Sequence, residues 1–357
     1  MGRLLRRQRA LLALPLLAVA AWLCASCGGR DAAHRGVARD AAAPRDAGAA
    51  RATWIEASDG GVPRYVVFPG AGPALAHVLQ DKPRVVGFGE YHQRVGGPTV
   101  PSAIKRFTEQ MLPVLATQAT DLVVETWVTD GSCGVTEKKV VANVKKTTAR
   151  PKATENEIVT LALKARAARV QPHALKVGCA DYQKMLGGKN VDYVKLLEFI
   201  GRQLRDTAVA AMAQRDRPPA TARGGGPDAG VVAGSSPDGG APAGGAPDRR
   251  RLVALYGGAL HNDLYPAAGL EAWSFAADLA KHGRYVEVDL YVPEYVAGDE
   301  RLAKEPWFPL LRRAGPDRVL VVERDKDSYI FVLSTTPLPA SAPAATGGAG
   351  PSREVPR

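Results

Sequence analysis

Residues 84–90, with the sequence RVVGFGE, form a short run of apolar and β-branched residues that ends in a carboxylate. Three later runs have the same character, namely DLVVETWV (121–128), LKVGCAD (175–181) and RLVALYGGA (251–259). Short continuous apolar runs are typical of strands that are buried on both faces of a sheet. We therefore predict that these four segments form the core strands.

Longer stretches with apolar residues at three-to-four spacing lie between these runs, namely SAIKRFTEQMLPVL (102–115), ENEIVTLALKARAARV (155–170) and VDYVKLLEFIGRQLRDTAVAAMAQ (191–214). This spacing predicts amphipathic helices. Strands that alternate with helices indicate a mainly parallel sheet with helices on its faces. The predicted fold class is therefore α/β, with a mainly parallel sheet flanked by helices.

Further elements are predicted at both ends of the core. VPRYVVF (62–68) and PALAHVLQ (73–80) predict a short strand and a helix ahead of the first core strand. RYVEVDLYV (284–292) alternates in the manner of a strand. RVLVVERDKDSYIFVLS (318–334) predicts two strands joined by a tight turn, which gives a C-terminal β-hairpin at the sheet edge.

The segment 129–156 separates the second core strand from the next predicted helix. A connection of this length is usually a lid, a binding loop or a small helical lobe, and its Gly, Ser, Lys and Thr content favours a mobile loop. Its basic run from Lys138 to Lys152 lacks the interleaved aromatic residues that stack on nucleic acid. We therefore expect a solvated run and no nucleic-acid partner, although the formal net charge of the chain is +11.

Three segments have too few large apolar residues to bury a core, namely 27–53, 215–248 and 337–357. We interpret them as a disordered tether, a disordered surface insertion and a disordered tail. The insertion does not require a domain boundary, because the entropic cost of closing a loop grows only slowly with its length. Residues 54–336 are therefore predicted to form one α/β domain with residues 215–248 inserted.

The N-terminus has the pattern of a secretory signal. A basic segment, MGRLLRRQR, precedes an apolar stretch that contains Pro15 and runs into small residues before Cys27. The apolar stretch is shorter than the roughly 20 residues of a membrane-spanning helix. We predict a signal peptide over 1–26 and a lipoprotein whose Cys27 carries palmitate and related acyl chains. Gly28 beside that cysteine favours the outer membrane, with the protein facing the periplasm or the exterior.

Cys133 and Cys179 remain after the N-terminal cysteines are assigned to the signal and the anchor. An oxidising compartment outside the inner membrane would allow these two residues to form a disulfide. The alternative is that Cys179 is an inert thiol buried in a strand.

Ionisable side chains stand at the ends of successive predicted strands: Glu90 and His92 at the first, Glu125 at the second, Asp181 at the third and His261 just after the fourth. Open α/β sheets bind their ligands at the carboxyl ends of the strands. The sequence therefore predicts one crevice that these side chains line. The alternative for Asp181, a helix cap or a solvated residue, is equally supported.

Two carboxylates and two imidazoles support two kinds of chemistry. Glu90, His92, Glu125 and His261 could ligate a divalent metal that activates water. Without a metal, a histidine oriented by a carboxylate could act as general base while a second His or Glu protonates the leaving group. Gly89 and Gly258 lie next to these residues and would let the backbone approach a ligand closely.

The same residues carry a family resemblance. VVGFGEYHQ (85–93) resembles the opening Gly-Glu-x-His motif of the superfamily that includes ChaN-like haem-binding lipoproteins, erythromycin esterases and Tiki/TraB proteins. DLVVET (121–126) resembles the second-strand Glu motif of that superfamily. YGGALHND (256–263) is similar to its late Gly-rich strand that ends in His. The resemblance covers roughly residues 80–295.

The resemblance implies that Glu90, His92, Glu125 and His261 are polar pocket residues. Members of the superfamily range from haem binding to ester hydrolysis and proteolysis, so a shared fold does not fix the function. For a haem cofactor, the candidate axial ligands are Tyr91, Tyr182, Tyr256 and Tyr265.

Three functions are compatible with these observations. The first is a membrane-anchored protein that binds a small molecule such as haem or a metal-linked ligand. The second is an ester or amide hydrolase, either metal-assisted or acid–base, that uses the same Glu and His residues. The third is a non-catalytic scaffold of the cell envelope.

Overall fold

The computed structural model describes residues 53–56, 63–148, 150–151, 154, 156–187, 190–217 and 250–337. The predicted signal peptide, Cys27, nearly all of the predicted tether and tail, and the predicted insertion from residue 218 onward lie outside the described residues.

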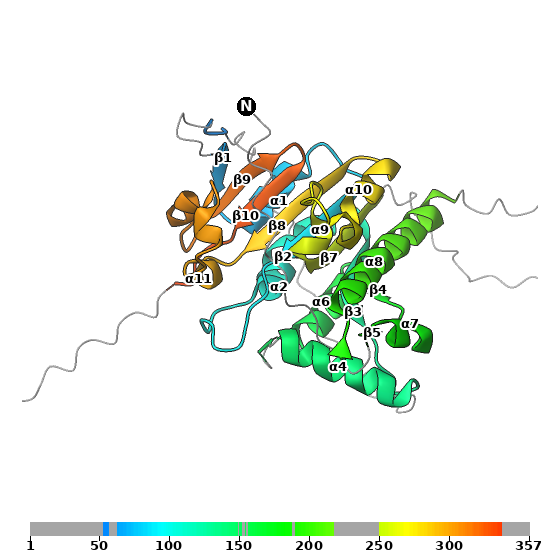
Figure 1. The fold of residues 1–357 in the computed structure, drawn as a ribbon. Coiled ribbons are helices and arrows are strands. Elements are labelled where there is room, and N and C mark those ends of the chain that lie inside the picture. The colour runs from blue at the N-terminus through cyan, green and yellow to red at the C-terminus, as the bar shows by residue number, and fades with distance from the viewer. Residues whose placement is uncertain are drawn as a thin grey trace, which may run out of the picture.

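Eight strands form one sheet in the order β1-β9-β10-β8-β2-β7-β3-β4 (Figure 1). Their bounds are β1 (Tyr65–Phe68), β2 (Val85–Glu90), β3 (Ala119–Trp127), β4 (Gln171–Leu175), β7 (Leu252–Gly258), β8 (Tyr285–Tyr291), β9 (Val319–Asp325) and β10 (Ser328–Val332). All neighbours from β10 to β4 pair in parallel, whereas β9 pairs antiparallel with β10 and β1. The predicted mainly parallel sheet and C-terminal hairpin are thus confirmed. The predicted position of the hairpin at the sheet edge is wrong, because β1 pairs with the outer side of β9 and forms that edge.

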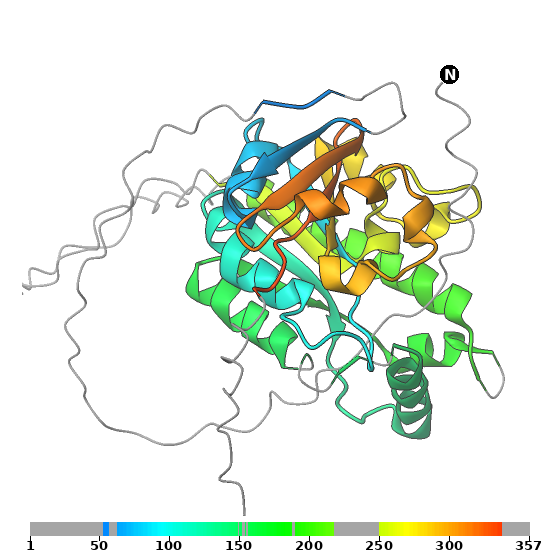
Figure 2. The same ribbon diagram turned by 90° about the vertical axis from the view of Figure 1, so that its left-hand side faces the viewer.

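Helices cover both faces of this sheet (Figure 2). One face is covered by α1 (Ala71–Val78), by α6 (Glu157–Ala167) and by the consecutive segments α2 (Ala103–Arg106), η2 (Phe107–Met111) and α3 (Leu112–Leu115). The other face is covered by α8 (Tyr193–Asp216), α9 (Ala259–Asn262), η3 (Glu271–Trp273), α10 (Ala276–Leu279) and η4 (Ala280–His282). Near β9 and β10 lie α11 (Pro293–Val296), η5 (Leu302–Lys304) and η6 (Phe308–Arg313).

Strand β2 lies inside the sheet, and its side chains pack against helices on both faces. All six residues are buried, and Phe88 packs against Phe107 with ring centroids 4.8 Å apart. On the opposite face, a Cβ at Gly87 would lie 1.9 Å from the side chains of Asn262 and Tyr285. Glycine therefore allows α9 to lie directly on the strand.

The predicted strand at 175–181 is wrong. Strand β4 ends at Leu175, and α7 (Cys179–Lys184) begins four residues later. Gly178 precedes α7, and its N–H donates to the Asp181 carboxylate at 3.1 Å. The apolar residues of LKVGCAD suggested a single strand, but the chain leaves the sheet at its exposed edge, where few strand contacts hold it.

The mobile loop predicted over 129–156 contains a helix instead, α4 (Gly134–Thr148). Its buried residues Val140 and Val144 are four apart and pack in the same core cluster as Tyr182 and Met185. Tertiary packing of this narrow apolar stripe outweighs the weak helix propensity of the Gly, Thr and Val residues.

A small lobe is formed by α4, α7 and the hairpin of β5 (Leu186–Gly187) and β6 (Asn190–Val191). Figure 1 shows it beyond the β3–β4 edge of the sheet. A disulfide between Cys133 and Cys179, with Cα atoms 5.1 Å apart, joins the start of α4 to the start of α7. The predicted disulfide and the predicted helical lobe are thus both present.

Short strands form both edges of the sheet: β1 has four residues and β4 has five, including Pro172. In the described part of the chain, no helix combines the length and the apolar character needed to cross a membrane.

Candidate functional site

Four of the predicted site residues gather at the carboxyl ends of β2, β7 and β3. These three strands are neighbours in the sheet (Figure 1). Glu90 ends β2 and is 5% exposed, and His92 follows two residues later. Glu125 lies near the end of β3 and is 8% exposed, while His261 lies in α9 after β7 and is fully buried. All four side chains are therefore held close to the same edge.

Glu90 is the centre of a buried ionic cluster. His92 Nδ1 makes a close contact with its Oε1, and Arg150 Nη2 donates to the same oxygen at 2.7 Å. The Tyr256 hydroxyl donates to Oε2. Burial would raise the pKa of Glu90, but the charges of Arg150 and His92 and the hydrogen bonds outweigh burial and lower that pKa to about 2. Glu90 is therefore ionised near neutral pH.

Arg150 is the site residue that the sequence analysis missed. It follows α4, and its Nη2 also lies 3.1 Å from Nε2 of His92. The basic run around it predicts a solvated segment, and nothing in its spacing distinguishes Arg150 from the nearby lysines. Only the path of α4 back to the sheet edge places this arginine on Glu90.

Glu125 and His261 form a second pair with a different character. Oε2 of Glu125 accepts the Gly258 N–H at 2.6 Å, and Nδ1 of His261 donates to the Trp273 carbonyl at 2.7 Å. Oε1 of Glu125 and Nε2 of His261 face each other at 4.0 Å. Among the described residues, neither of these two buried atoms has a hydrogen-bonding partner.

Burial dominates the ionisation of this pair. It raises the pKa of Glu125 to about 7, against the opposing influence of His92 and the Gly258 N–H. Burial also lowers the pKa of His261 to about 4, although the bond to the Trp273 carbonyl favours the charged ring. The neutral ring carries its hydrogen on Nδ1, so Nε2 is an acceptor that faces a carboxyl group able to hold a proton.

The two groups lie on opposite faces of the sheet. Glu90 shares its face with Phe88, which packs under α2 and η2. Glu125 lies against Gly257, where a Cβ would be 2.6 Å from Oε2, on the face that α8 and α9 cover. The carboxylates therefore meet only around the end of the sheet.

A small cavity lies where the groups meet. It has a volume of about 10 Å³ and is lined by Glu90, His92, Glu125, Arg150 and Tyr256, among others. A cavity needs roughly 10–15 Å³ of this kind of volume to hold one water molecule. The site thus has the size of a single water binding position between the two carboxylates.

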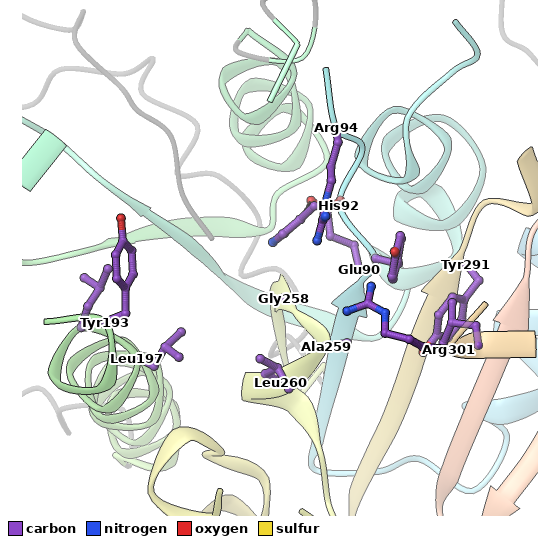
Figure 3. Close-up of a pocket in the computed structure, with 13 residues that line it drawn as sticks. Glu90, His92, Arg94, Tyr193, Leu197, Gly258, Ala259, Leu260, Tyr291 and Arg301 are labelled. Atoms are coloured by element: carbon purple, nitrogen blue, oxygen red, sulfur yellow. Dashed lines mark hydrogen bonds and ion pairs between the residues drawn. The ribbon is translucent and has the colours of Figure 1, made fainter. Parts of the chain in front are cut away.

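A larger pocket opens on the other side of Glu90 and His92 and has a volume of about 120 Å³. Figure 3 shows Tyr193 and Leu197 of α8 on one side, Tyr291 and Arg301 on the other, and Gly258 to Leu260 between them. The wall is largely apolar, with Glu90, His92, Arg94 and Arg301 as its ionisable groups. The reactive edge is therefore accessible to a small, partly apolar molecule.

Comparison of the chain with protein-family models, curated proteins and solved structures finds no match.

The predicted metal site does not fit this arrangement. Within the part of the chain that the structure describes, no group of three or more His, Cys, Asp or Glu side chains is placed to hold a metal ion. Arg150 occupies the position beside Glu90 and His92 that a cation would need. Glu125 and His261 supply only two donors on the other face. The donor set fits acid–base chemistry instead.

The residues also do not fit haem. Tyr91 is the one candidate axial ligand that lines the larger pocket, and its hydroxyl donates to Asp299 at 2.6 Å. Tyr256 bonds Glu90, Tyr265 donates to a backbone carbonyl, and Tyr182 is buried in the small lobe. A volume of about 120 Å³ is also below the roughly 300–1,000 Å³ of pockets for drug-sized ligands.

The remaining predicted residues have structural positions. A Cβ at Gly89 would lie 2.6 Å from Cα of Ala259, so this glycine lets α9 approach β2. Gly258 lines the larger pocket and holds Glu125 through its N–H. Asp181 caps the first turn of α7 in the small lobe and is not among the residues that line either cavity at the site. Its alternative interpretation as a helix cap is the correct one.

Proposed function

We propose that this chain is a hydrolase that cleaves an ester or amide bond of a small molecule by acid–base catalysis at the carboxyl edge of the sheet. The observation that carries the proposal is the pair of buried carboxyl groups at one cavity, with a pKa of about 2 for Glu90 and about 7 for Glu125. Carboxyl groups whose environments separate their pKa values are typical of an acid and base pair with different tasks.

Glu90 and His92 supply the base. Ionised Glu90 accepts the hydrogen on Nδ1 of His92, which leaves a lone pair on Nε2 in the neutral ring. Nε2 exchanges its contact with Nη2 of Arg150, 3.1 Å away, for a water molecule. It takes a proton from this water as the water oxygen attacks the carbonyl carbon of the substrate. Arg150 balances the negative charge of Glu90, so the cluster keeps this state although it is buried.

Glu125 supplies the acid. When the tetrahedral intermediate collapses, the bond between the carbonyl carbon and the leaving oxygen or nitrogen breaks. The leaving atom takes a proton that Glu125 passes through a water molecule in the small cavity, because Glu125 lines that cavity and not the larger pocket. The proton on His92 then returns to Glu125 through solvent, so the cycle consumes one water. His261 is a positioning residue, because its acceptor atom Nε2 faces Oε1 of Glu125 and favours the protonated carboxyl.

Further support comes from the resemblance of residues 85–93, 121–126 and 256–263 to a superfamily that includes erythromycin esterases. Glu90, His92 and Glu125 of those motifs line the small cavity, and His261 faces Glu125. The pocket beside them is small and largely apolar, which suits a short acyl or alkyl group.

An assay of purified full-length protein on short-chain nitrophenyl esters and anilides tests the proposal. We expect turnover that chelation with EDTA leaves unchanged and that Glu90→Gln lowers by at least about 100-fold. Asp121→Asn is a matched control, because Asp121 is a buried carboxylate that contacts His173 at 2.8 Å and Arg215 at 3.0 Å at the opposite end of β3. Equal rates for wild type and Glu90→Gln would contradict the proposal, as would turnover that requires a metal.

We also propose that the protein is a lipoprotein anchored in the outer membrane through Cys27. The support is the basic and apolar N-terminal pattern of residues 1–26 and the small residues before Cys27. Mass spectrometry of the mature N-terminus tests it. A first residue other than an acylated Cys27 would contradict it.

A further inference from the structure

The larger pocket contains an arginine that the proposed chemistry does not use. Arg301 lies between α11 and η5, and Figure 3 shows its guanidinium extending into the pocket from the side of Tyr291, toward Glu90. The side chain is 46% exposed, so it lies at the mouth rather than in the core.

A neighbouring carboxylate fixes the orientation of this arginine. Asp299 accepts hydrogen bonds from Nε of Arg301 at 3.3 Å and from Nη2 at 2.9 Å. Asp299 is itself held by the Tyr91 hydroxyl at 2.6 Å and by the backbone N–H groups of Arg301 and Leu302. Burial would raise the pKa of Asp299, but these hydrogen bonds outweigh it and keep the carboxylate ionised. The guanidinium is therefore preorganised, and one edge of it is taken by Asp299.

The wall of the pocket around this guanidinium is largely apolar. Asp299 takes Nε and Nη2 of Arg301, and Figure 3 shows the guanidinium extending into the pocket. A fixed guanidinium edge matches the geometry of a carboxylate, and apolar surroundings strengthen a hydrogen bond between them.

We infer that the substrates of this site are small amphipathic molecules with an apolar body and a carboxylate, and that Arg301 binds the carboxylate. This inference rests on the proposed hydrolytic function of the same site and names its substrate class. The volume of about 120 Å³ limits the body that is enclosed to a few carbon atoms, with the carboxylate at the mouth beside Arg301. The scissile bond then lies between that mouth and the edge formed by Glu90 and His92.

Calorimetric titration of the full-length protein with hexanoate and with hexanamide tests the inference, because the two probes differ mainly in charge. We expect hexanoate to bind at least tenfold more tightly, and we expect added salt to weaken hexanoate more than hexanamide. Arg301→Gln should remove the tenfold preference, and Arg301→Lys should retain part of it, since lysine keeps the charge without the planar fork. Arg205→Gln is the matched control, because Arg205 also pairs with an aspartate, Asp278, but lies on α8 away from the pocket.

Equal binding of the two probes to wild type, or an unchanged preference in Arg301→Gln, would overturn the inference. Wild-type turnover of neutral esters without any preference for hexanoate would retain the hydrolase and remove its substrate class. Charge-selective binding without turnover of any ester or amide would retain the role of Arg301 in binding and remove the hydrolase. The two proposals therefore fail on different measurements.

Discussion

Glu90 and Glu125 are the same residue type, are buried to a similar degree and lie at the ends of strands separated only by β7, yet their environments are opposite. Glu90 is surrounded by an arginine, a histidine and a tyrosine hydroxyl. Glu125 has one backbone N–H and faces an imidazole at 4.0 Å. Because burial is similar at the two positions, the side chains that arrive from other elements set the difference in charge between the two carboxyl groups.

Replacement of Glu90 should have the largest effect on the hydrolytic rate, and it tests whether Glu90 is the ionised member of the two carboxyl groups. Glu90→Gln removes the acceptor that orients His92 and leaves Arg150 without its carboxylate, so we expect the hydrolytic rate to fall by about 10³-fold. The pKa of Glu90 is lowered to about 2, so its contribution to stability is present above its unfolded pKa near 4.5 and is lost as the pH falls toward 2. At pH 7 the variant should lose about 3 kcal/mol of unfolding free energy.

Urea denaturation of wild type and Glu90→Gln at pH 7 measures this loss, and ester assays measure the rate. The control Asp121→Asn should also lose stability, since it breaks a similar contact with His173 and Arg215, but should keep its activity. A stable and active Glu90→Gln would show that the ionic cluster has no function.

Glu125→Gln should lower the rate by about 10²-fold and should change stability in the opposite direction. The pKa of Glu125 is raised to about 7, so its contribution to stability is fully present below about pH 4.5 and is lost as the pH rises through 7. The amide needs no proton to stay neutral, so at pH 8 the variant should gain about 3 kcal/mol over wild type.

Thermal or urea denaturation at pH 5 and pH 8 measures that gain, which should be small at pH 5 and large at pH 8. A variant that is less stable than wild type at both pH values would show that Glu125 is ionised in the folded protein. The same pair of measurements on Glu90→Gln serves as the control of opposite sign.

The pH dependence of turnover also distinguishes Glu125 from Glu90, with a smaller change in rate than the two substitutions. If Glu125 is the general acid, kcat should fall about tenfold per pH unit above a midpoint near 7, because the ionised form cannot donate a proton. Glu90 should contribute no midpoint between pH 5 and 9. Glu125→Gln should have a residual rate without the fall near pH 7, and a retained fall would assign it to another group.

Reduction of the Cys133–Cys179 disulfide should have the smallest effect on the rate, less than about tenfold. The disulfide holds the start of α4, whereas Arg150 follows the end of that helix. Val140 and Val144 still pack in the core after reduction, so Arg150 should lose only part of its positioning. Assays with and without dithiothreitol, with a Cys133→Ser and Cys179→Ser double variant as control, measure it. A loss as large as that of Glu90→Gln would show that the small lobe assembles only with the bond.

The sequence predicts the sheet and four of the site residues for a clear physical reason. Buried parallel strands need continuous apolar runs, and their carboxyl ends meet at one edge, so Glu90, Glu125 and His261 are brought together by topology alone. The predicted strands at 84–90, 121–128 and 251–259 correspond to β2, β3 and β7.

Arg150, α4 and α7 could not be predicted in this way. Arg150 belongs to no spacing pattern, and its contact with Glu90 depends on the course of a helix whose own stability comes from tertiary packing and a disulfide. Similarly, the division of the four site residues over two faces depends on Gly257 and on the approach of α9 to β2. These are properties of packed side chains and not of periodicity.

Strand β4 is the last strand in the sheet, so one of its sides has no neighbouring strand among the described residues. An edge strand exposes backbone groups that another chain can pair with, and such pairing leads to aggregation. Pro172 removes an N–H from β4, which is only five residues long, so the edge is a poor template for a strand from a second molecule. A short edge strand that contains a proline would thus reduce edge-to-edge association between copies of this protein.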